Sequence, residues 1–294
     1  KYGFSTLVCH RAILYHASIN VRKMMMLYEL FLFGLLSGVT TWLFGFGGGF
    51  VAVPLLYTVI IQKWSNESSV GIHAMQIAVA TSAFVMLCSA SFAVFRHYRS
   101  GHIDWQKIRF LWGGIALGGI VGAVMASLFN GNWLRWIFMG YVFITILDCY
   151  YRPGFIVTSR QKQHYGQNSE LIKGGIIGWV AALLGVGGSV MTVPLLRRRG
   201  SSMAEAAAIA NILTLPLSLT ATLTYCVLSV WQSEWAPSGF IGLIWFETAL
   251  FLVAGTWIGL YFSEKFISKL PDLWRAKLYP LLLIIVLLVM FFLN

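Results

Sequence analysis

Residues 34–56 read GLLSGVTTWLFGFGGGFVAVPLL and residues 174–196 read GGIIGWVAALLGVGGSVMTVPLL, so the chain carries one glycine-rich pattern twice. Laid over each other without gaps, the two stretches share five glycines, one proline and the two leucines that follow it. Hydrophobic segments that glycine and proline interrupt at corresponding places in two halves of a chain point to the binding site of a transporter. The repeated pattern therefore predicts the architecture and the position of a site together.

The composition is that of a membrane protein. The 294 residues are 58% hydrophobic and 11% charged, with a mean hydropathy of +0.76. About a quarter of the residues in a soluble domain are charged. Several apolar runs also approach the ~20 residues that cross a bilayer as a helix. We therefore predict an all-α polytopic membrane protein in contact with lipid.

The residues disfavour three other classes of function. The net charge of +11 comes from Lys and Arg in short loops, where such residues set orientation in the membrane, so we expect no nucleic-acid partner. The four cysteines are widely spaced and show no zinc-site spacing, so we expect no metal and no cofactor. The sequence GGSV around Ser189 lacks the glycine of an intramembrane serine protease, and no histidine lies deep in an apolar run as its base. Neither glycine cluster matches a P-loop or a dinucleotide fingerprint, and we predict no enzyme.

The first apolar segment is too long to cross a membrane as one straight helix. Its 35 residues would reach ~52 Å at ~1.5 Å each, against a hydrocarbon core of ~30 Å. Glycine tolerates backbone angles that helices do not use, and proline disfavours helix in the residue before it. We expect breaks at two turns, here called the first elbow (residues 45–49) and the second elbow (residues 185–189). In all, the sequence predicts about eight membrane segments, at residues 27–61, 75–95, 110–129, 133–150, 174–196, 204–230, 241–262 and 278–293.

Loop charges favour a topology in which each elbow segment enters the membrane and returns to its own side. If all eight segments crossed once, Lys and Arg would divide 12 against 9, with no asymmetry. If both elbow segments are re-entrant, one side collects 15 of the 21. Positive residues prefer the cytoplasm, so the re-entrant arrangement is the better one. The second elbow segment has only 23 residues, and a single plain span remains the alternative there.

The re-entrant topology divides the chain into two inverted repeats. We assign residues 24–150 to the first membrane repeat, 151–173 to a cytoplasmic linker and 174–294 to the second membrane repeat, with both termini outside the cytoplasm. Residues 1–23 are polar and basic and precede three methionines, so we expect the natural chain to start near Met24.

The two elbows form the predicted site. Irregular backbone at membrane depth must be buried in protein or lie in water. Half-helices that start after Gly49 and Ser189 would direct unpaired N–H groups and positive dipole ends into one space, which suits an anion. The alternative is that the glycines serve tight helix packing. We assign packing to Gly34, Gly38, Gly174, Gly178 and the glycines at 113, 114, 118, 119 and 122, and a site to the two elbows.

Polar residues in the following segments are further candidates. Thr81 and Ser82 follow the first elbow, and Asn211 and Thr214 occupy the matching place after the second. Each could bind an anion's oxygens, although hydroxyls in membrane helices also bond their own backbone. Glu247 is the most interior acid and is the candidate for binding a coupling proton, since an ionisable group in a span points to function. The alternative is that Glu247 lies near enough to the start of its span to reach headgroup water.

These residues resemble the TauE/SafE family of membrane permeases, also called the sulfite exporter or DUF81 family. The matching features are GFGGGFVAVPLL, the A-x-A-T-S that follows, the loop His97…Gly101-x-Ile103-Asp104 and GVGGSVMTVPLL. The resemblance implies export of small sulfur-containing anions, such as sulfite or organosulfonates, across the bacterial inner membrane. Two departures leave the substrate open: Ser189 replaces a third glycine, and Ala210-Asn211-Ile212 stands where the family often has Gly-Thr-Ser.

The sequence therefore predicts a secondary transporter that alternates access around an anion site, with a proton-coupled mechanism through Glu247. The alternatives are a passive anion channel, which needs the same amides but no protonatable residue, and a permease for other small organic anions. The oligomeric state does not follow from the sequence. The predicted substrate-binding residues are Gly45, Gly47, Gly48, Gly49, Phe50, Pro54, Thr81, Ser82, Gly185, Gly187, Gly188, Ser189, Pro194, Asn211 and Thr214.

Overall fold

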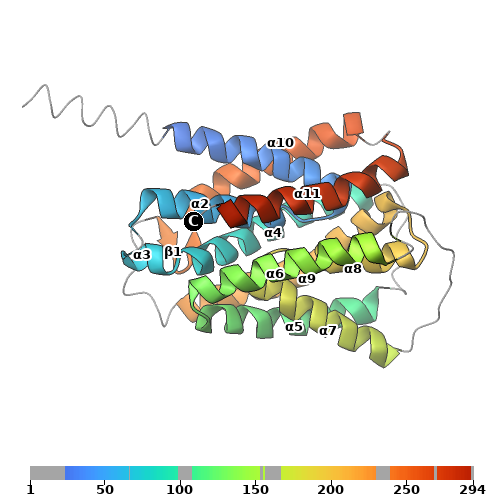
Figure 1. Ribbon diagram of the computed structural model, residues 1–294, viewed down its shortest axis with the longest axis horizontal. Helices are drawn as coiled ribbons and strands as arrows, with labels where there is room; N and C mark the ends of the chain where they lie inside the picture. The colour runs from blue at the N-terminus through green and yellow to red at the C-terminus, as the bar shows by residue number, and fades with distance from the viewer. Residues whose placement is uncertain are drawn as a thin grey trace, which may run out of the picture.

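The computed structural model describes residues 24–65, 67–98, 108–152, 155, 167–229, 239–267 and 270–292. Long helices lie side by side along one axis of the molecule (Figure 1). Seven of the described helices are long and apolar enough to cross a membrane. The prediction of an all-α polytopic membrane protein is confirmed. The expected tail at 1–23 and the motif at 101–104 lie outside the described residues, as does most of the linker.

The described residues form helices and one pair of two-residue strands. In the first half they are the helix Met24–Phe44, α2 (Gly49–Lys63), α3 (Ser69–Ile72), α4 (Ala74–Tyr98), α5 (Arg109–Leu128) and α6 (Gly131–Tyr151). In the second half they are α7 (Gln167–Leu184), α8 (Ser189–Arg198), α9 (Met203–Ser229), α10 (Phe246–Ile267) and α11 (Asp272–Phe292). The short strands β1 (Phe240–Ile241) and β2 (Ile244–Trp245) pair antiparallel just before α10.

Both predicted helix breaks are present. The first helix ends at Phe44 and α2 begins at Gly49, whereas α7 ends at Leu184 and α8 begins at Ser189. Five of the six glycines between them take the left-handed conformation, in which a β-carbon is strained, with φ of 73°, 62° and 84° at positions 45, 47 and 48 and 66° and 57° at positions 185 and 187. Gly188, with φ of −61°, is the exception. Pro54 and Pro194 lie inside α2 and α8 and end neither helix, so the glycines alone make the breaks.

The first elbow segment returns to the end of the bundle at which it starts. The helix Met24–Phe44 runs beside α10 in the same direction. A β-carbon on Gly34 would lie 2.7 Å from Leu252 O, and one on Gly38, one turn later, would overlap Thr256 O, which is also one turn later in α10. Trp64 follows α2 and packs on Trp245, which precedes α10, with ring centroids 5.0 Å apart. The start of the first helix and the end of α2 therefore share one end, here called the tryptophan end.

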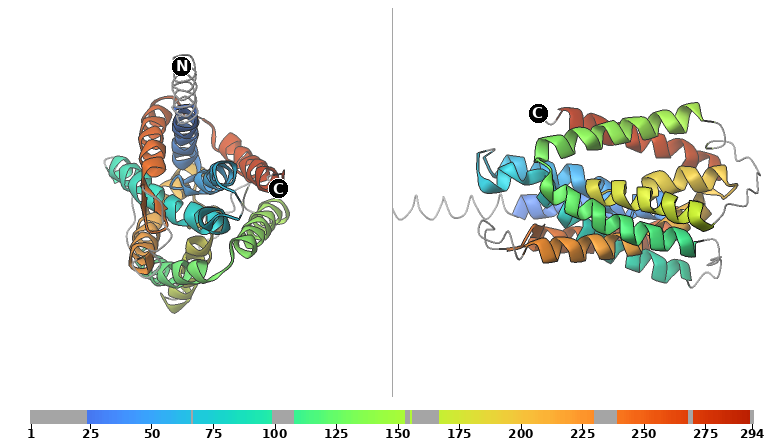
Figure 2. Two further views of the ribbon diagram at one scale, coloured as in Figure 1. Left: turned by 90° about the vertical axis from the view of Figure 1, so that its left-hand side faces the viewer. Right: turned by 90° about the horizontal axis from the view of Figure 1, so that it is seen from below.

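The second elbow segment also doubles back, from the opposite end. Arg199, just after α8, pairs with both carboxylate oxygens of Glu170 in the first turn of α7, at 2.9 and 2.8 Å. The neighbouring Arg197 pairs with Asp272 at the start of α11, at 2.8 Å. We call this the arginine end. The segment thus starts and ends at the same end of the bundle and is not a single plain span; Figure 2 shows the bundle of long helices in two further views.

Most of the glycines predicted to serve packing do so. A β-carbon on Gly38 would collide with the backbone of α10, and one on Gly114, Gly118 or Gly122 would collide with the backbone of α7. Gly174 and Gly178 meet α5 from the other side in the same way, while Gly113 has only ordinary contacts. Close approach of two backbones needs small residues. These glycines therefore fix the first helix against α10 and α7 against α5.

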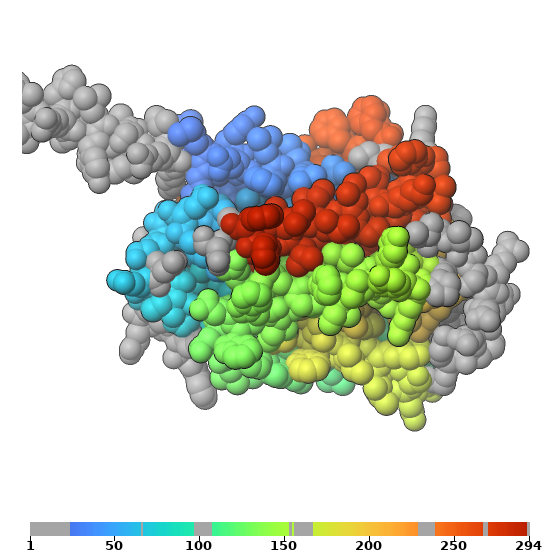
Figure 3. Space-filling model, in the orientation of Figure 1, coloured from blue at the N-terminus to red at the C-terminus, as the bar shows by residue number. Residues whose placement is uncertain are grey.

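Outward-facing side chains are apolar where the helices would meet lipid. In the space-filling view α6 and α11 lie beside each other over one face of the molecule (Figure 3). Exposed residues on them include Phe143, Ile144, Leu281 and Leu288. A soluble protein rarely exposes so continuous an apolar surface, which agrees with a bilayer around the bundle.

Candidate functional site

The two elbows touch each other inside the molecule. A β-carbon on Gly49 would lie 2.9 Å from Gly185 O, and one on Gly187 would lie 3.0 Å from Phe46 O. All residues at 45–49 and 185–189 are buried. Two turns that are 140 residues apart in the sequence therefore form one interior junction.

Two helix starts meet at this junction without side-chain caps. Neither α2, with Gly48 before its first turn, nor α8, with Gly188, receives a capping hydrogen bond from a described side chain. The first N–H groups of an α-helix have no acceptor within the helix, and they carry the positive end of its dipole. Buried, uncapped helix starts that converge from opposite ends of the bundle suit a negatively charged ligand.

Three buried polar atoms of α8 and α9 have no hydrogen-bond partner among the described residues. Within the part of the chain that the structure describes, Ser189 Oγ, Thr192 Oγ1 and Asn211 Oδ1 have no hydrogen-bond partner, and all three residues are 0% exposed. The amide nitrogen of Asn211 donates to Thr41 O at 3.2 Å, which links α9 to the helix Met24–Phe44. Burying a polar atom without a hydrogen-bond partner costs free energy, so each of these three atoms needs an explanation. A bound ligand that accepts hydrogen bonds would explain the hydroxyls of Ser189 and Thr192.

Thr192 is absent from the residues predicted from sequence. It lies three positions after Ser189, on the same side of α8, and only its burial without a partner distinguishes it from other membrane hydroxyls. Tyr279 on α11 is likewise new. Its hydroxyl donates to Val190 O at 3.0 Å, and its ring packs on Phe46 at 5.3 Å, so it contacts both elbow segments.

The predicted polar residues on α4 and α9 have different neighbours. Ser82 Oγ lies 3.0 Å from Gly185 O and also 2.7 Å from Val79 O in its own helix. The Thr214 methyl would lie 2.7 Å from a β-carbon on Gly47, while its hydroxyl donates to Ala210 O within α9 at 2.8 Å. Thr81 Oγ1 accepts from Trp245 N at 3.0 Å, toward the β-hairpin. The structure thus brings Ser82 and Thr214 to the elbows and gives Thr81 another neighbour.

The remaining predicted residues flank the junction or lie apart from it. Phe50 is buried against Phe46 and Phe138, with ring centroids 4.8 and 6.2 Å away. Pro54 and Pro194 are buried within the half-helices. Glu247 is the second residue of α10, at the tryptophan end, and is partly exposed. It lies five residues, or about 8 Å along the helix axis, before Leu252, which meets Gly34 of the helix Met24–Phe44.

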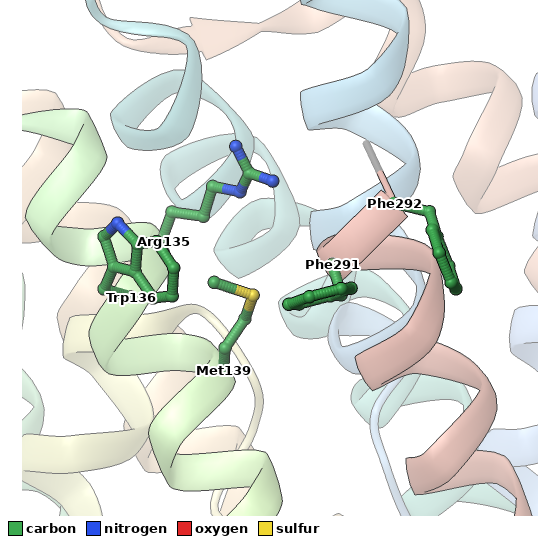
Figure 4. A pocket seen from close by; sticks show the side chains of 5 residues that line it. All are labelled: Arg135, Trp136, Met139, Phe291 and Phe292. Carbon is green, nitrogen blue, oxygen red and sulfur yellow. The ribbon is translucent and has the colours of Figure 1, made fainter. Parts of the chain in front are cut away.

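A separate pocket lies at the surface between α6 and α11 (Figure 4). Its volume is about 260 Å³, and it is lined by Arg135, Trp136, Met139, Phe291 and Phe292. Met139 and Phe291 point toward each other across it. None of the lining residues belongs to an elbow, so this pocket is distinct from the junction.

Comparison with known proteins identifies the family of the chain. The family model of the sulfite exporter TauE/SafE matches residues 30–293, which include both elbows. The chain belongs to the TauE/SafE family. A probable membrane transporter protein of Haemophilus influenzae is 27% identical over 264 residues, covering 88% of this chain and 96% of that protein. The probable membrane transporter protein YunE of Bacillus subtilis is 24% identical, covering 77% and 83%.

A more distant relative is a probable membrane transporter protein of Methanocaldococcus jannaschii, 23% identical over 66% of this chain and 70% of that protein. No solved structure matches the chain. The family and the names of these relatives indicate a multi-pass membrane transporter and not an enzyme.

Proposed function

We propose that this TauE/SafE protein is an inner-membrane secondary transporter that exports small sulfur-containing anions such as sulfite or organosulfonates. The observation that carries the proposal is the pair of buried, uncapped helix starts that meet at the elbow junction. Such a pair binds an anion through backbone N–H groups and needs no buried Lys or Arg. The family description supplies the sulfur-containing class of substrate.

We further propose that residues 24–150 and 174–294 are inverted repeats, joined by the linker at 151–173. Matching contacts support this. A β-carbon on Gly45 would lie 2.9 Å from the β-carbon of Ala210 on α9, and one on Gly185 would lie 2.6 Å from Ser82 Oγ on α4. Each elbow thus packs on the long helix of the other half, as alternating access between two related halves requires.

The arginine end is the cytoplasmic one in this proposal, and both termini are outside the cytoplasm. The loops at 96–109, 151–173, 197–203 and 263–277 hold 15 of the 21 Lys and Arg. The ion pairs of Arg197 and Arg199 and the pair Arg96–Glu264 tie those loops together at one end. Positive residues prefer the cytoplasmic side, which supports this orientation.

The residues assigned to the anion are the first N–H groups of α2 and α8 with the hydroxyls of Ser189 and Thr192. Ser82, Asn211 and Thr214 hold the surrounding backbone. Glu247 is the candidate carrier of a coupling proton. Its position in the first turn of α10 gives it access to water at the tryptophan end.

Flux of labelled sulfite into or out of proteoliposomes tests the proposal. A proton gradient should drive uphill flux in the wild type, and Glu247→Gln should abolish the uphill component. Flux that only ever runs downhill would identify the passive anion channel instead. A parallel panel of thiosulfate, sulfoacetate, taurine and lactate tests the class of anion, and transport of lactate alone would identify a permease for other organic anions.

A further inference from the structure

The side chain of Met86 lies between the two elbows. Met86 is on α4 and is 0% exposed. A β-carbon on Gly49 would overlap its Cγ and Sδ, one on Gly47 would lie 3.6 Å from Cγ, and one on Gly187 would lie 3.2 Å from Sδ. The thioether therefore touches glycines of both elbows, at the place where the starts of α2 and α8 converge.

A hydroxyl of the junction is close to the same point. The position that a β-carbon on Gly187 would take is 3.2 Å from Met86 Sδ and 3.6 Å from Ser189 Oγ. Ser189 Oγ is one of the buried atoms without a partner among the described residues. The thioether thus fills space beside the hydroxyl that is assigned to the anion.

The matching position in the other half carries a different side chain. The contacts of Gly185 with Val79 and Ser82 on α4 resemble those of Gly45 with Ala207 and Ala210 on α9. Seven residues after Val79 is Met86, beside Gly187, and seven residues after Ala207 is Thr214, beside Gly47. One wall of the junction is therefore a long flexible thioether, where the other is a short threonine whose hydroxyl is used within its own helix.

We propose that Met86 is a specificity-determining residue that sets the size of the transported anion. This rests on the proposed function, because it assumes that the anion lies between the elbows. Methionine is unbranched, with three rotatable bonds, and it adapts to irregular space. Its side chain turns aside when an anion binds, and the room that it leaves limits how long a substituent on the anion can be.

Truncation of Met86 should shift selectivity toward larger anions. The experiment compares the flux of sulfite with that of methane-, ethane-, propane- and butanesulfonate in proteoliposomes, for the wild type and for Met86→Ala. One methylene in a binding pocket changes discrimination about tenfold or more. We expect the butanesulfonate-to-sulfite flux ratio of Met86→Ala to rise about tenfold, and that of Met86→Leu to stay near the wild-type value.

Met75→Ala is the matched control. Met75 is on the same helix, is also 0% exposed and lies beside Gly131 near the tryptophan end, away from the elbows. Its truncation lowers stability similarly but should leave the flux ratio unchanged. Met86→Val makes a smaller cavity and gives the same test if Met86→Ala is poorly folded.

The outcomes separate the two proposals. A wild type that moves these anions, with the same flux ratio in Met86→Ala, Met86→Val and Met75→Ala, overturns the role of Met86 and leaves the proposed function standing. A wild type that moves none of the anions overturns the proposed function and the role of Met86 with it. A ratio that rises in both Met86 variants and not in Met75→Ala supports the inference.

Discussion

Gly45→Ala should destabilise the protein strongly, because position 45 combines a left-handed backbone with contact on the other half. Gly45 has φ of 73°, where an L-residue with a β-carbon costs about 1–2 kcal/mol. The new β-carbon would lie 2.5 Å from Ala207 O and 2.9 Å from the β-carbon of Ala210. Neither neighbour is the end of a flexible side chain, so overpacking adds about 1–3 kcal/mol.

Together these effects predict a loss of about 2–5 kcal/mol. The assay is the midpoint of heat-induced loss of the monodisperse detergent-solubilised protein, followed by fluorescence-detected size exclusion. We expect a drop of at least about 4 °C, at about 2 °C or more per kcal/mol for a chain of this size. Gly140→Ala is the control, since a β-carbon there would meet nothing within 4 Å. Equal midpoints for Gly45→Ala and the wild type would refute the elbow geometry.

Three further substitutions test the packing, the ion pairs and the site. Asp272→Ala should cost about 1–3 kcal/mol, because it removes the carboxylate, itself 43% exposed, that pairs with the fully buried Arg197, and chemical denaturation in detergent would measure this loss. Gly118→Leu should abolish folded protein on size exclusion, because even a β-carbon would collide with α7. Ser189→Ala should not lower the heat midpoint of the ligand-free protein but should weaken anion binding about tenfold, the scale of one hydrogen bond to a charged group, as calorimetry would measure.

Each of these has its own control. Arg152→Ala removes an exposed partner of Asp148 and should cost less than 1 kcal/mol, so a similar loss from Asp272→Ala would argue against a role of Asp272 in stabilising the buried Arg197. Gly140→Leu should fold, in contrast to Gly118→Leu. Ser127→Ala removes a hydroxyl that bonds its own helix and should not alter binding; if Ser189→Ala behaves the same way, Ser189 does not contact the anion.

The sequence was informative where backbone conformation alone decides the structure. Glycine clusters predicted both helix breaks, because only glycine takes the left-handed angles of positions 45, 47, 48, 185 and 187 without strain. Loop charges predicted that the segments double back, and the pairing of Arg199 with Glu170 agrees with that. The prediction that the prolines help to break the helices was wrong, since Pro54 and Pro194 lie inside α2 and α8.

The site was less predictable because it depends on contacts across the two halves. Thr81 and Ser82 are neighbours in sequence, yet one faces the β-hairpin and the other faces the second elbow. Thr192 and Met86 look like ordinary residues of membrane helices, and only their burial and neighbours distinguish them. A sequence pattern specifies which residues share a helix face, but not which opposing helix that face meets.

The most direct test is the position of a bound anion in a crystal of the protein. Bromomethanesulfonate is an organosulfonate whose bromine scatters anomalously, and it marks the bound position without relying on flux. We predict one anomalous peak between the starts of α2 and α8, with sulfonate oxygens within hydrogen-bond distance of their first N–H groups and of Ser189 Oγ. A peak elsewhere, or unbroken helices through residues 45–49 and 185–189, would contradict the account.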